Sequence, residues 1–237
     1  QRCRSWHRTW LNRRLAVETR RRHLVKQSSR RQLRHELLED RRLLALTFQF
    51  NPDAGTSREV IQGFRDAGRL WQGLFDDNVT VVVDIAEQNL GATIIGSTLR
   101  ESTPVAYTNV RNALLTDART VDDVFAASNL SMNPALNIQM NLTSDNPNGV
   151  GSAVPYVDND AGANNTLINV PRSNARALGL IAPNDPIADG RIVFNTTNFT
   201  FDFDRTDGIA AGATDFVFIA AHEIGHLLGF VSGVDSV

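Results

Sequence analysis

"DFVFIAAHEIGHLLGF", residues 215–230, is the stretch of the sequence that decides the fold. Its residues are almost all apolar, and a segment of this length that is apolar around its whole circumference is typical of a buried helix. The main exceptions are two imidazoles and a carboxylate, at His222, Glu223 and His226. Because unpaired polar groups are costly to bury, these three side chains need partners. The sequence therefore predicts a long buried helix that carries a polar site.

The spacing of the three polar residues indicates a metal site. Residues four apart on a helix lie one above the other, with about 5–6 Å between their Cβ atoms. His222 and His226 can therefore direct ring nitrogens to one Zn²⁺ ion at distances of about 2.0–2.1 Å. Glu223 lies about 100° around the helix from His222, beside the ion. We expect Glu223 to act as general base on a zinc-bound water and then to protonate the leaving amine. The pattern predicts a zinc metallopeptidase.

The alternative is that both histidines are ordinary side chains of the core or the surface. It is disfavoured because the chain from residue 46 onward contains no other histidine. Two glycines support the metal site. Gly225 costs a helix interior about 1 kcal/mol relative to alanine, so we expect backbone to pack closely against backbone there. Gly229 is expected to adopt a positive φ, to end the helix and to turn the chain back toward the ion.

His222, Glu223, His226 and Gly229 match the first part of the pattern His-Glu-x-x-His-x-x-Gly-x-x-His/Asp, and the chain here resembles the metzincin-like zincins. The resemblance implies an α+β fold with a mixed sheet beside the active-site helix, Zn²⁺ as cofactor, and a protein or peptide as substrate. In zincins an edge strand precedes this helix and pairs with the substrate backbone. Residues 191–195, RIVFN, fit that place, although their pattern is equally typical of an ordinary strand.

The pattern departs from the family at its last position, where Ser232, a poor zinc ligand, replaces His or Asp. Because the body has no further histidine, we expect a carboxylate as the third ligand, either Asp235 or a residue beyond Val237. Metzincins have a methionine turn after the third ligand, and Met132 and Met140 come too early to form it. The catalytic domain, predicted over residues 46–237, is therefore expected to be truncated at its C-terminal end.

Strand and helix patterns alternate through this body, which indicates an α+β domain. Strands are expected at residues 47–51, 79–86, 92–98, 137–142, 166–170 and 190–196, and further helices at residues 57–75, 103–115 and 120–130. The first of these helices has Ser57 as its expected N-cap. Its apolar face is expected to comprise Val60, Ile61, Phe64, Leu70, Trp71 and Leu74. The second is expected to hold Pro104 in its opening turn.

The N-terminal segment differs from the body in charge. Residues 1–44 hold 14 Lys and Arg against four acidic residues, a balance of +10, whereas the rest holds 10 against 22, a balance of −12. Residues 1–45 are predicted to be a basic export segment without a folded core. A solvated tail and a nucleic-acid arm are the alternatives, and the second is disfavoured because the acidic body repels phosphates.

Two resemblances bear on localisation. Residues 38–45, LEDRRLLA, resemble the Leu-Glu-Pro-Arg-x-Leu-Leu segment that begins many large bacterial extracytoplasmic proteins, with Asp40 in place of proline. Residues 222–235, HEIGHLLGFVSGVD, together with the upstream GRIVFN and FDFDRTDGI, resemble a group of bacterial exported metalloproteases. They imply export, a folded part that begins near Leu46, and an extracellular or cell-surface location.

Composition excludes several other classes. Cys3 is the one cysteine, so the chain has no internal disulfide, and the body lacks the Cys ligand that deformylase-like chemistry needs. No run of about 18 apolar residues is present, so we expect no transmembrane segment. Asp202, Asp204 and Asp207 form either a calcium site or a solvated loop. The remaining alternative is a non-catalytic, metal-binding surface or adhesion domain, and the oligomeric state stays open.

Overall fold

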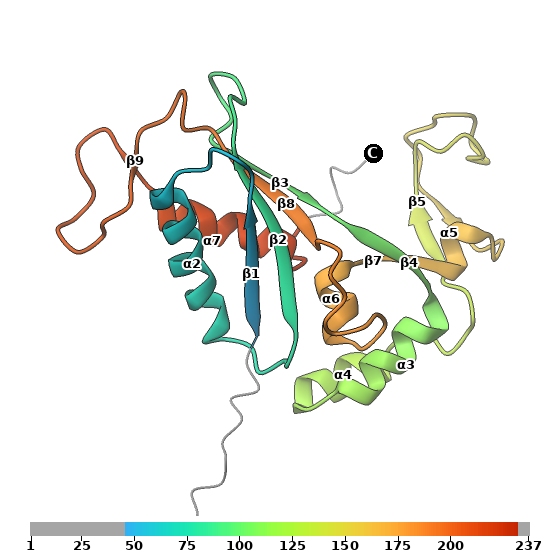
Figure 1. Cartoon of the computed structure of the whole chain (residues 1–237). Coiled ribbons are helices and arrows are strands. Elements are labelled where there is room, and N and C mark those ends of the chain that lie inside the picture. Colours follow the sequence, from blue (N-terminus) through green and yellow to red (C-terminus); the bar gives the residue numbers. More distant parts are fainter. Residues whose placement is uncertain (1–45, 232–237) are drawn as a thin grey trace, which may run out of the picture. The chain divides into compact units, whose positions relative to one another are not determined.

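Four strands form the central sheet of a mixed α+β structure. The computed structural model describes residues 46–231, which lie within the unit Leu43–Val237. The strand order is β1 (Thr47–Pro52), β2 (Thr80–Glu87), β8 (Gly190–Phe194) and β3 (Gly96–Arg100). The first three strands run parallel, and β3 pairs antiparallel with β8 (Figure 1). β1 and β3 therefore lie at the two edges of this sheet.

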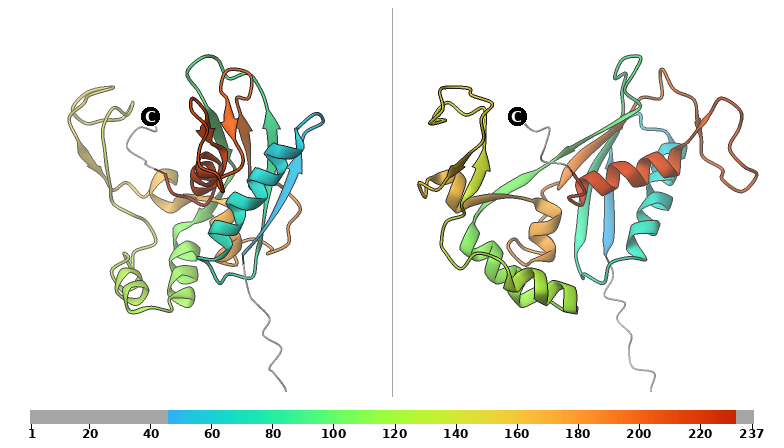
Figure 2. Two further views of the ribbon diagram at one scale, coloured as in Figure 1. Left: turned by 90° about the vertical axis from the view of Figure 1, so that its left-hand side faces the viewer. Right: turned by 180° about the vertical axis from the view of Figure 1, so that it is seen from behind.

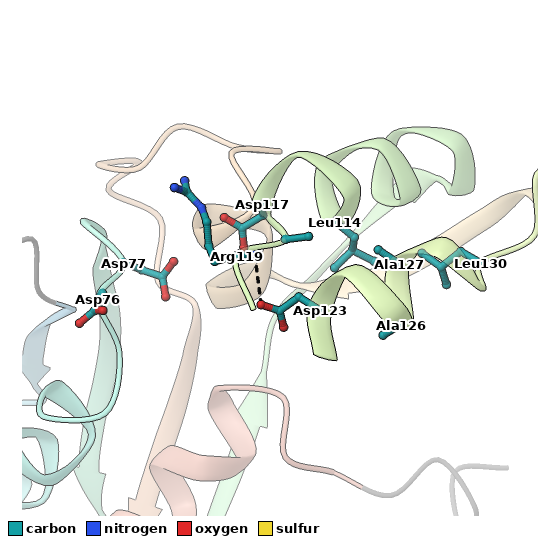
Figure 3. A pocket seen from close by; sticks show the side chains of 10 residues that line it. Asp76, Asp77, Leu114, Asp117, Arg119, Asp123, Ala126, Ala127 and Leu130 are labelled. Atoms are coloured by element: carbon teal, nitrogen blue, oxygen red, sulfur yellow. Dashed lines mark hydrogen bonds between the residues drawn. The ribbon is translucent and has the colours of Figure 1, made fainter. Parts of the chain in front are cut away.

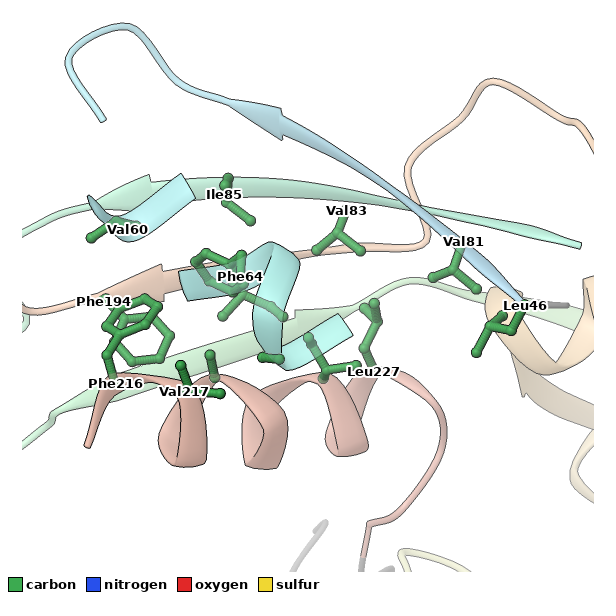
Figure 4. Packing of buried hydrophobic residues seen from close by; sticks show 14 of the residues in the cluster. Leu46, Val60, Phe64, Val81, Val83, Ile85, Phe194, Phe216, Val217 and Leu227 are labelled. Atoms are coloured by element: carbon green, nitrogen blue, oxygen red, sulfur yellow. The ribbon is translucent and has the colours of Figure 1, made fainter. Parts of the chain in front are cut away.

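Two helices pack on one face of the sheet. They are α2 (Arg58–Gln72) and α7 (Phe216–Leu227), and α7 crosses in front of the strands in the right-hand view of Figure 2. Phe64 of α2 lies at the centre of the core, with ring centroids 5.5 Å from Phe50, 5.4 Å from Phe194 and 5.6 Å from Phe216 (Figure 4). The helices approach closely because Gly63 has no side chain: a Cβ there would lie 2.3 Å from the Phe216 ring.

Three two-stranded sheets and four further helices complete the described residues. The strand pairs are β4 (Ser102–Ala106) with β7 (Leu167–Pro171), β5 (Ile138–Met140) with β6 (Tyr156–Asp158), and β9 (Phe201–Asp202) with β10 (Thr214–Asp215). The helices are α3 (Tyr107–Asp117), α4 (Val121–Ser128), α5 (Ala163–Thr166) and α6 (Arg172–Ala177). A second, small apolar cluster forms where Val110, Val170 and Ala175 meet.

A buried ion pair links α6 to the central sheet. Arg176 Nε lies 2.8 Å from Asp189 Oδ1, and both side chains are fully buried. Asp189 immediately precedes β8, and its carboxylate also accepts a hydrogen bond from the Val82 backbone N–H of β2 at 2.8 Å. The pair therefore fixes the start of β8 against its neighbour.

Most predicted elements are confirmed. The strands expected at residues 47–51, 79–86, 137–142, 166–170 and 190–196 exist, as do the helices at 57–75 and 120–130, with small differences in their ends. Ser57 is the N-cap of α2, as predicted, and accepts a hydrogen bond from the Val60 N–H. The strand expected at residues 92–98 is displaced and forms β3. The short elements β6, α5 and α6 were not predicted.

Two predictions about helices are wrong. Pro104 lies in β4, where it pairs with Asn169, and the following helix begins only at Tyr107. A proline is tolerated there because a two-stranded ribbon has free edges that need no N–H. On α2, Leu70 and Leu74 are 50% and 71% exposed, because the helix ends at Gln72 and buries small residues in its second half.

Several expectations concern residues outside the described part of the chain. They are the export segment at residues 1–45 and the residues Ser232 and Asp235. Among residues 46–231, no helix has the length and apolar character needed to cross a membrane.

Candidate metal centre

The helix α7 is defined at both ends by its own sequence. Asp215 caps the N-terminus, where its carboxylate accepts a hydrogen bond from the Phe218 N–H at 3.0 Å. At the C-terminus, Gly229 has φ +95°, which confirms the predicted turn. The N–H groups of Gly229 and Phe230 donate to the carbonyls of His226 and Gly225 at 3.1 and 3.0 Å. This double hydrogen bond is a Schellman motif, which reverses the chain just after the histidines.

The two histidines converge on one point. His222 Nε2 and His226 Nε2 lie 3.0 Å apart, with ring planes at 84° to each other. Two nitrogens that bind one zinc ion tetrahedrally at about 2.0–2.1 Å lie roughly 3.3 Å apart, close to the distance found here. His222 is exposed and His226 is half-buried, so the point they face is open to solvent. The two imidazole nitrogens and their spacing fit two of the ligands of a zinc ion.

A backbone carbonyl fixes the proton on His226. The Nδ1 atom lies 2.8 Å from the carbonyl oxygen of Phe230. A carbonyl only accepts hydrogen bonds, so Nδ1 carries the hydrogen and Nε2 presents its lone pair. This is the arrangement that ligating histidines adopt, because the partner of the second nitrogen sets the tautomer and the orientation of the ring.

Glu223 of α7 directs its side chain toward the edge strand β3. Its side chain is buried, with 7% of the residue exposed. The Thr98 hydroxyl donates to Glu223 Oε2 at 2.6 Å, and the Glu223 backbone carbonyl lies 3.1 Å from the same hydroxyl. Gly96 leaves room for the carboxylate, since a Cβ there would lie 3.3 Å from Oε1. The carboxylate therefore has one defined place, against Thr98 and Gly96 of β3.

The prediction that backbone packs closely against backbone at Gly225 is wrong. No backbone packs on it in the described residues; instead the indole of Trp71 lies there, and a Cβ at Gly225 would be 3.2 Å from Trp71 Cζ2. The role given to residues 191–195 as the edge strand is also wrong. They lie mostly in β8, which is paired on both sides by β2 and β3. The edge strand next to α7 is β3.

The third ligand is not found in the described residues. Residues 46–231 contain no cluster of three or more His, Cys, Asp or Glu side chains that could hold a metal ion. Asp235 lies outside this part, so its role stays a prediction. The proposed calcium residues do not gather either: Asp202 accepts hydrogen bonds from the N–H groups of Asp204 and Ala210, and Asp204 accepts from Thr206.

A separate, acidic cavity of about 560 Å³ lies between α3, α4 and the loop before β2 (Figure 3). Asp76, Asp77, Asp117 and Asp123 line it, together with Arg119 and apolar residues. Burial, and then repulsion by Asp117, raises the pKa of Asp77. None of the lining residues belongs to α7 or β3, so the cavity is distinct from the histidine site.

Comparison of the chain with protein-family models, with curated proteins and with solved structures gives no match. The case for function therefore rests on the geometry of this site. The site also includes Thr98, Trp71 and Phe230, to which the sequence alone gives no role in it. No spacing rule relates Thr98 or Trp71 to the histidines, because they belong to the distant elements β3 and α2.

Proposed function

We propose that the protein is an exported zinc metallopeptidase of the zincin type. The observation that carries the proposal is the approach of His222 Nε2 and His226 Nε2 to 3.0 Å, with Glu223, the residue that follows His222, buried and hydrogen-bonded to Thr98. The position of β3, an edge strand against α7, supports the same reading, since zincins pair the substrate backbone with an edge strand. The resemblance of residues 38–45 to export segments supports an extracellular or cell-surface location.

In the proposed reaction, each residue of the site has its own role. His222 and His226 would hold Zn²⁺, and either Asp235 or a residue beyond Val237 would supply the third ligand. Bound zinc supplies Lewis acidity, which polarises a carbonyl group and lowers the pKa of a water molecule. Glu223 takes the proton of the attacking water and returns it to the leaving amine of the cleaved peptide bond. Thr98 donates to one oxygen of Glu223 and so holds the carboxylate in one orientation.

The test compares the full chain with His226→Ala and Glu223→Gln. Zinc content is measured by mass spectrometry, and casein cleavage is followed with and without a chelator. We expect near-stoichiometric zinc and chelator-sensitive cleavage in the wild type, and loss of both in His226→Ala. Glu223→Gln is expected to keep its zinc and to lose about 10²–10⁴-fold in kcat, the usual contribution of a general base.

Two outcomes contradict the proposal. If the wild type binds zinc but does not cleave casein, and Glu223→Gln behaves in the same way, the protein is the non-catalytic surface domain instead. Absence of zinc from the wild-type protein contradicts a zinc site that residues 1–237 complete by themselves, and with it the proposed activity of this chain.

A further inference from the structure

Trp71 connects α2 to the helix that carries the histidines. It is the penultimate residue of α2, and its indole N–H donates to the Ala221 carbonyl of α7 at 2.9 Å. The six-membered part of the indole lies on Gly225, where a Cβ would approach Cζ2 to 3.2 Å. The indole packs directly on the Gly225 backbone, which explains why a glycine lies inside this helix.

The same ring packs on the residue that orients His226. The centroids of Trp71 and Phe230 are 5.4 Å apart, at an interplanar angle of 32°. Phe230 itself is 58% exposed, so the rest of the protein covers only part of its side chain. The backbone N–H of Phe230 donates to the Gly225 carbonyl, and the backbone carbonyl of Phe230 accepts from His226 Nδ1. Trp71 therefore touches both residues joined by the Schellman hydrogen bond.

We propose that Trp71 is a positioning residue for the metal site. By holding Phe230 against Gly225, it keeps the Phe230 carbonyl on His226 Nδ1, and so keeps the Nε2 lone pair directed at the point that His222 also faces. This inference rests on the proposed zinc site. Loss of a partner that orients a ligating histidine typically weakens metal binding about 10–100-fold, which sets the size of the expected effect.

The experiment uses the full chain, with ¹⁵N-labelled histidine, as wild type, Trp71→Leu and Phe75→Leu. Phe75 is the matched control because it stacks on Trp71, with centroids 6.1 Å apart, and belongs to the same aromatic group. Long-range ¹H–¹⁵N spectra of the metal-free proteins at pH 8 report which nitrogen of neutral His226 carries the hydrogen. Zinc affinity is then measured by competition with a chromogenic chelator.

The wild type and Phe75→Leu are expected to carry the hydrogen on Nδ1 and to bind zinc equally. In Trp71→Leu we expect a shift toward the Nε2–H tautomer and zinc binding weakened about 10-fold or more. If Trp71→Leu does not fold, Trp71→Phe takes its place, since the smaller ring lacks the N–H that reaches Ala221. For Trp71→Phe we also expect a shift toward the Nε2–H tautomer and weaker zinc binding.

An unchanged tautomer in a folded Trp71 variant overturns the inference, and so does an equal shift in Phe75→Leu, which would indicate general loosening of the aromatic group. The tautomer is measured without metal. A wild type that binds no zinc therefore contradicts the proposed function, while the spectra still decide the role of Trp71.

Discussion

At the scale of single residues, the Glu223 carboxylate is oriented by a partner from elsewhere in the chain, the Thr98 hydroxyl of β3. His222, Glu223 and His226 are predictable because helical geometry alone brings residues four apart to one face. Thr98 is not predictable, since it reaches Glu223 from a strand 125 positions earlier in the chain. Its contribution depends on tertiary packing, for which a single sequence offers no spacing rule.

The Thr98 hydroxyl can be tested directly. Thr98→Val keeps the shape of the side chain and removes the donor to Glu223. A hydrogen bond to a charged group contributes about 1.5–3 kcal/mol, so we expect kcat to fall about 10–100-fold. KM and zinc content are expected to stay unchanged, because the two hydrogen bonds of the Thr98 hydroxyl both go to Glu223 and neither goes to a histidine.

Thr98→Ser is the control, since it restores the hydroxyl and is expected to recover most of kcat. Steady-state kinetics on a fluorogenic peptide measure both variants. Wild-type kcat in Thr98→Val shows that Glu223 needs no such partner.

At the scale of elements, the end of α7 brings the Phe230 carbonyl to His226, so the proposed metal site depends on this turn. The sequence predicts this end well, because a glycine three residues after the second histidine is a local signal for a left-handed turn. By contrast, the helix expected at residues 103–115 begins four residues late, because Pro104 suits a helix start and an edge strand about equally. Only the pairing of β4 with β7 decides between the two.

Gly229→Ala tests the turn. A side chain in the left-handed region costs about 1–2 kcal/mol, and here the added Cβ would also lie 3.0 Å from the Asn174 side chain. We expect the free energy of unfolding to fall by about 1–3 kcal/mol from the two effects together. Zinc affinity is expected to fall as well, because the turn carries the Phe230 carbonyl to His226.

Gly208→Ala is the matched control. Gly208 has a similar φ of +91°, and a Cβ there would meet nothing within 4 Å. Urea denaturation is expected to show a smaller loss of stability in this variant, with zinc affinity unchanged. Equal effects of the two substitutions on zinc binding would mean that the turn at Gly229 has no special role in the site.

At the scale of the whole described molecule, the buried Asp189 links α6 to the central sheet through ion pairs with Arg176 and Arg172. The sequence marks Asp189 and Gly190 as a boundary before a strand, but it does not reveal that Asp189 is buried against Arg176 of α6. A charged residue is ordinarily expected at the surface. The α+β class follows from the alternation of elements, whereas the order of strands in the sheet depends on contacts far apart in the chain.

Asp189→Asn leaves the buried Arg176 guanidinium without its charge partner. Removal of one member of a buried pair typically costs about 3–5 kcal/mol, and we expect a loss of this size in urea denaturation followed by circular dichroism. Asp53→Asn is the control, because Asp53 forms an exposed pair with Arg191 and is expected to change stability little. Similar losses in both variants would contradict the special weight given to the buried pair.

The position of Trp71 has a practical consequence. The chain has three tryptophans, and Trp6 and Trp10 both precede residue 46, so Trp71 is the single indole of the described residues. With phenylalanine at the other two positions, all the tryptophan fluorescence of the protein comes from a ring that packs on Gly225 of α7. We expect the emission of that one fluorophore to report, without any attached label, whether the proposed metal site on α7 is occupied.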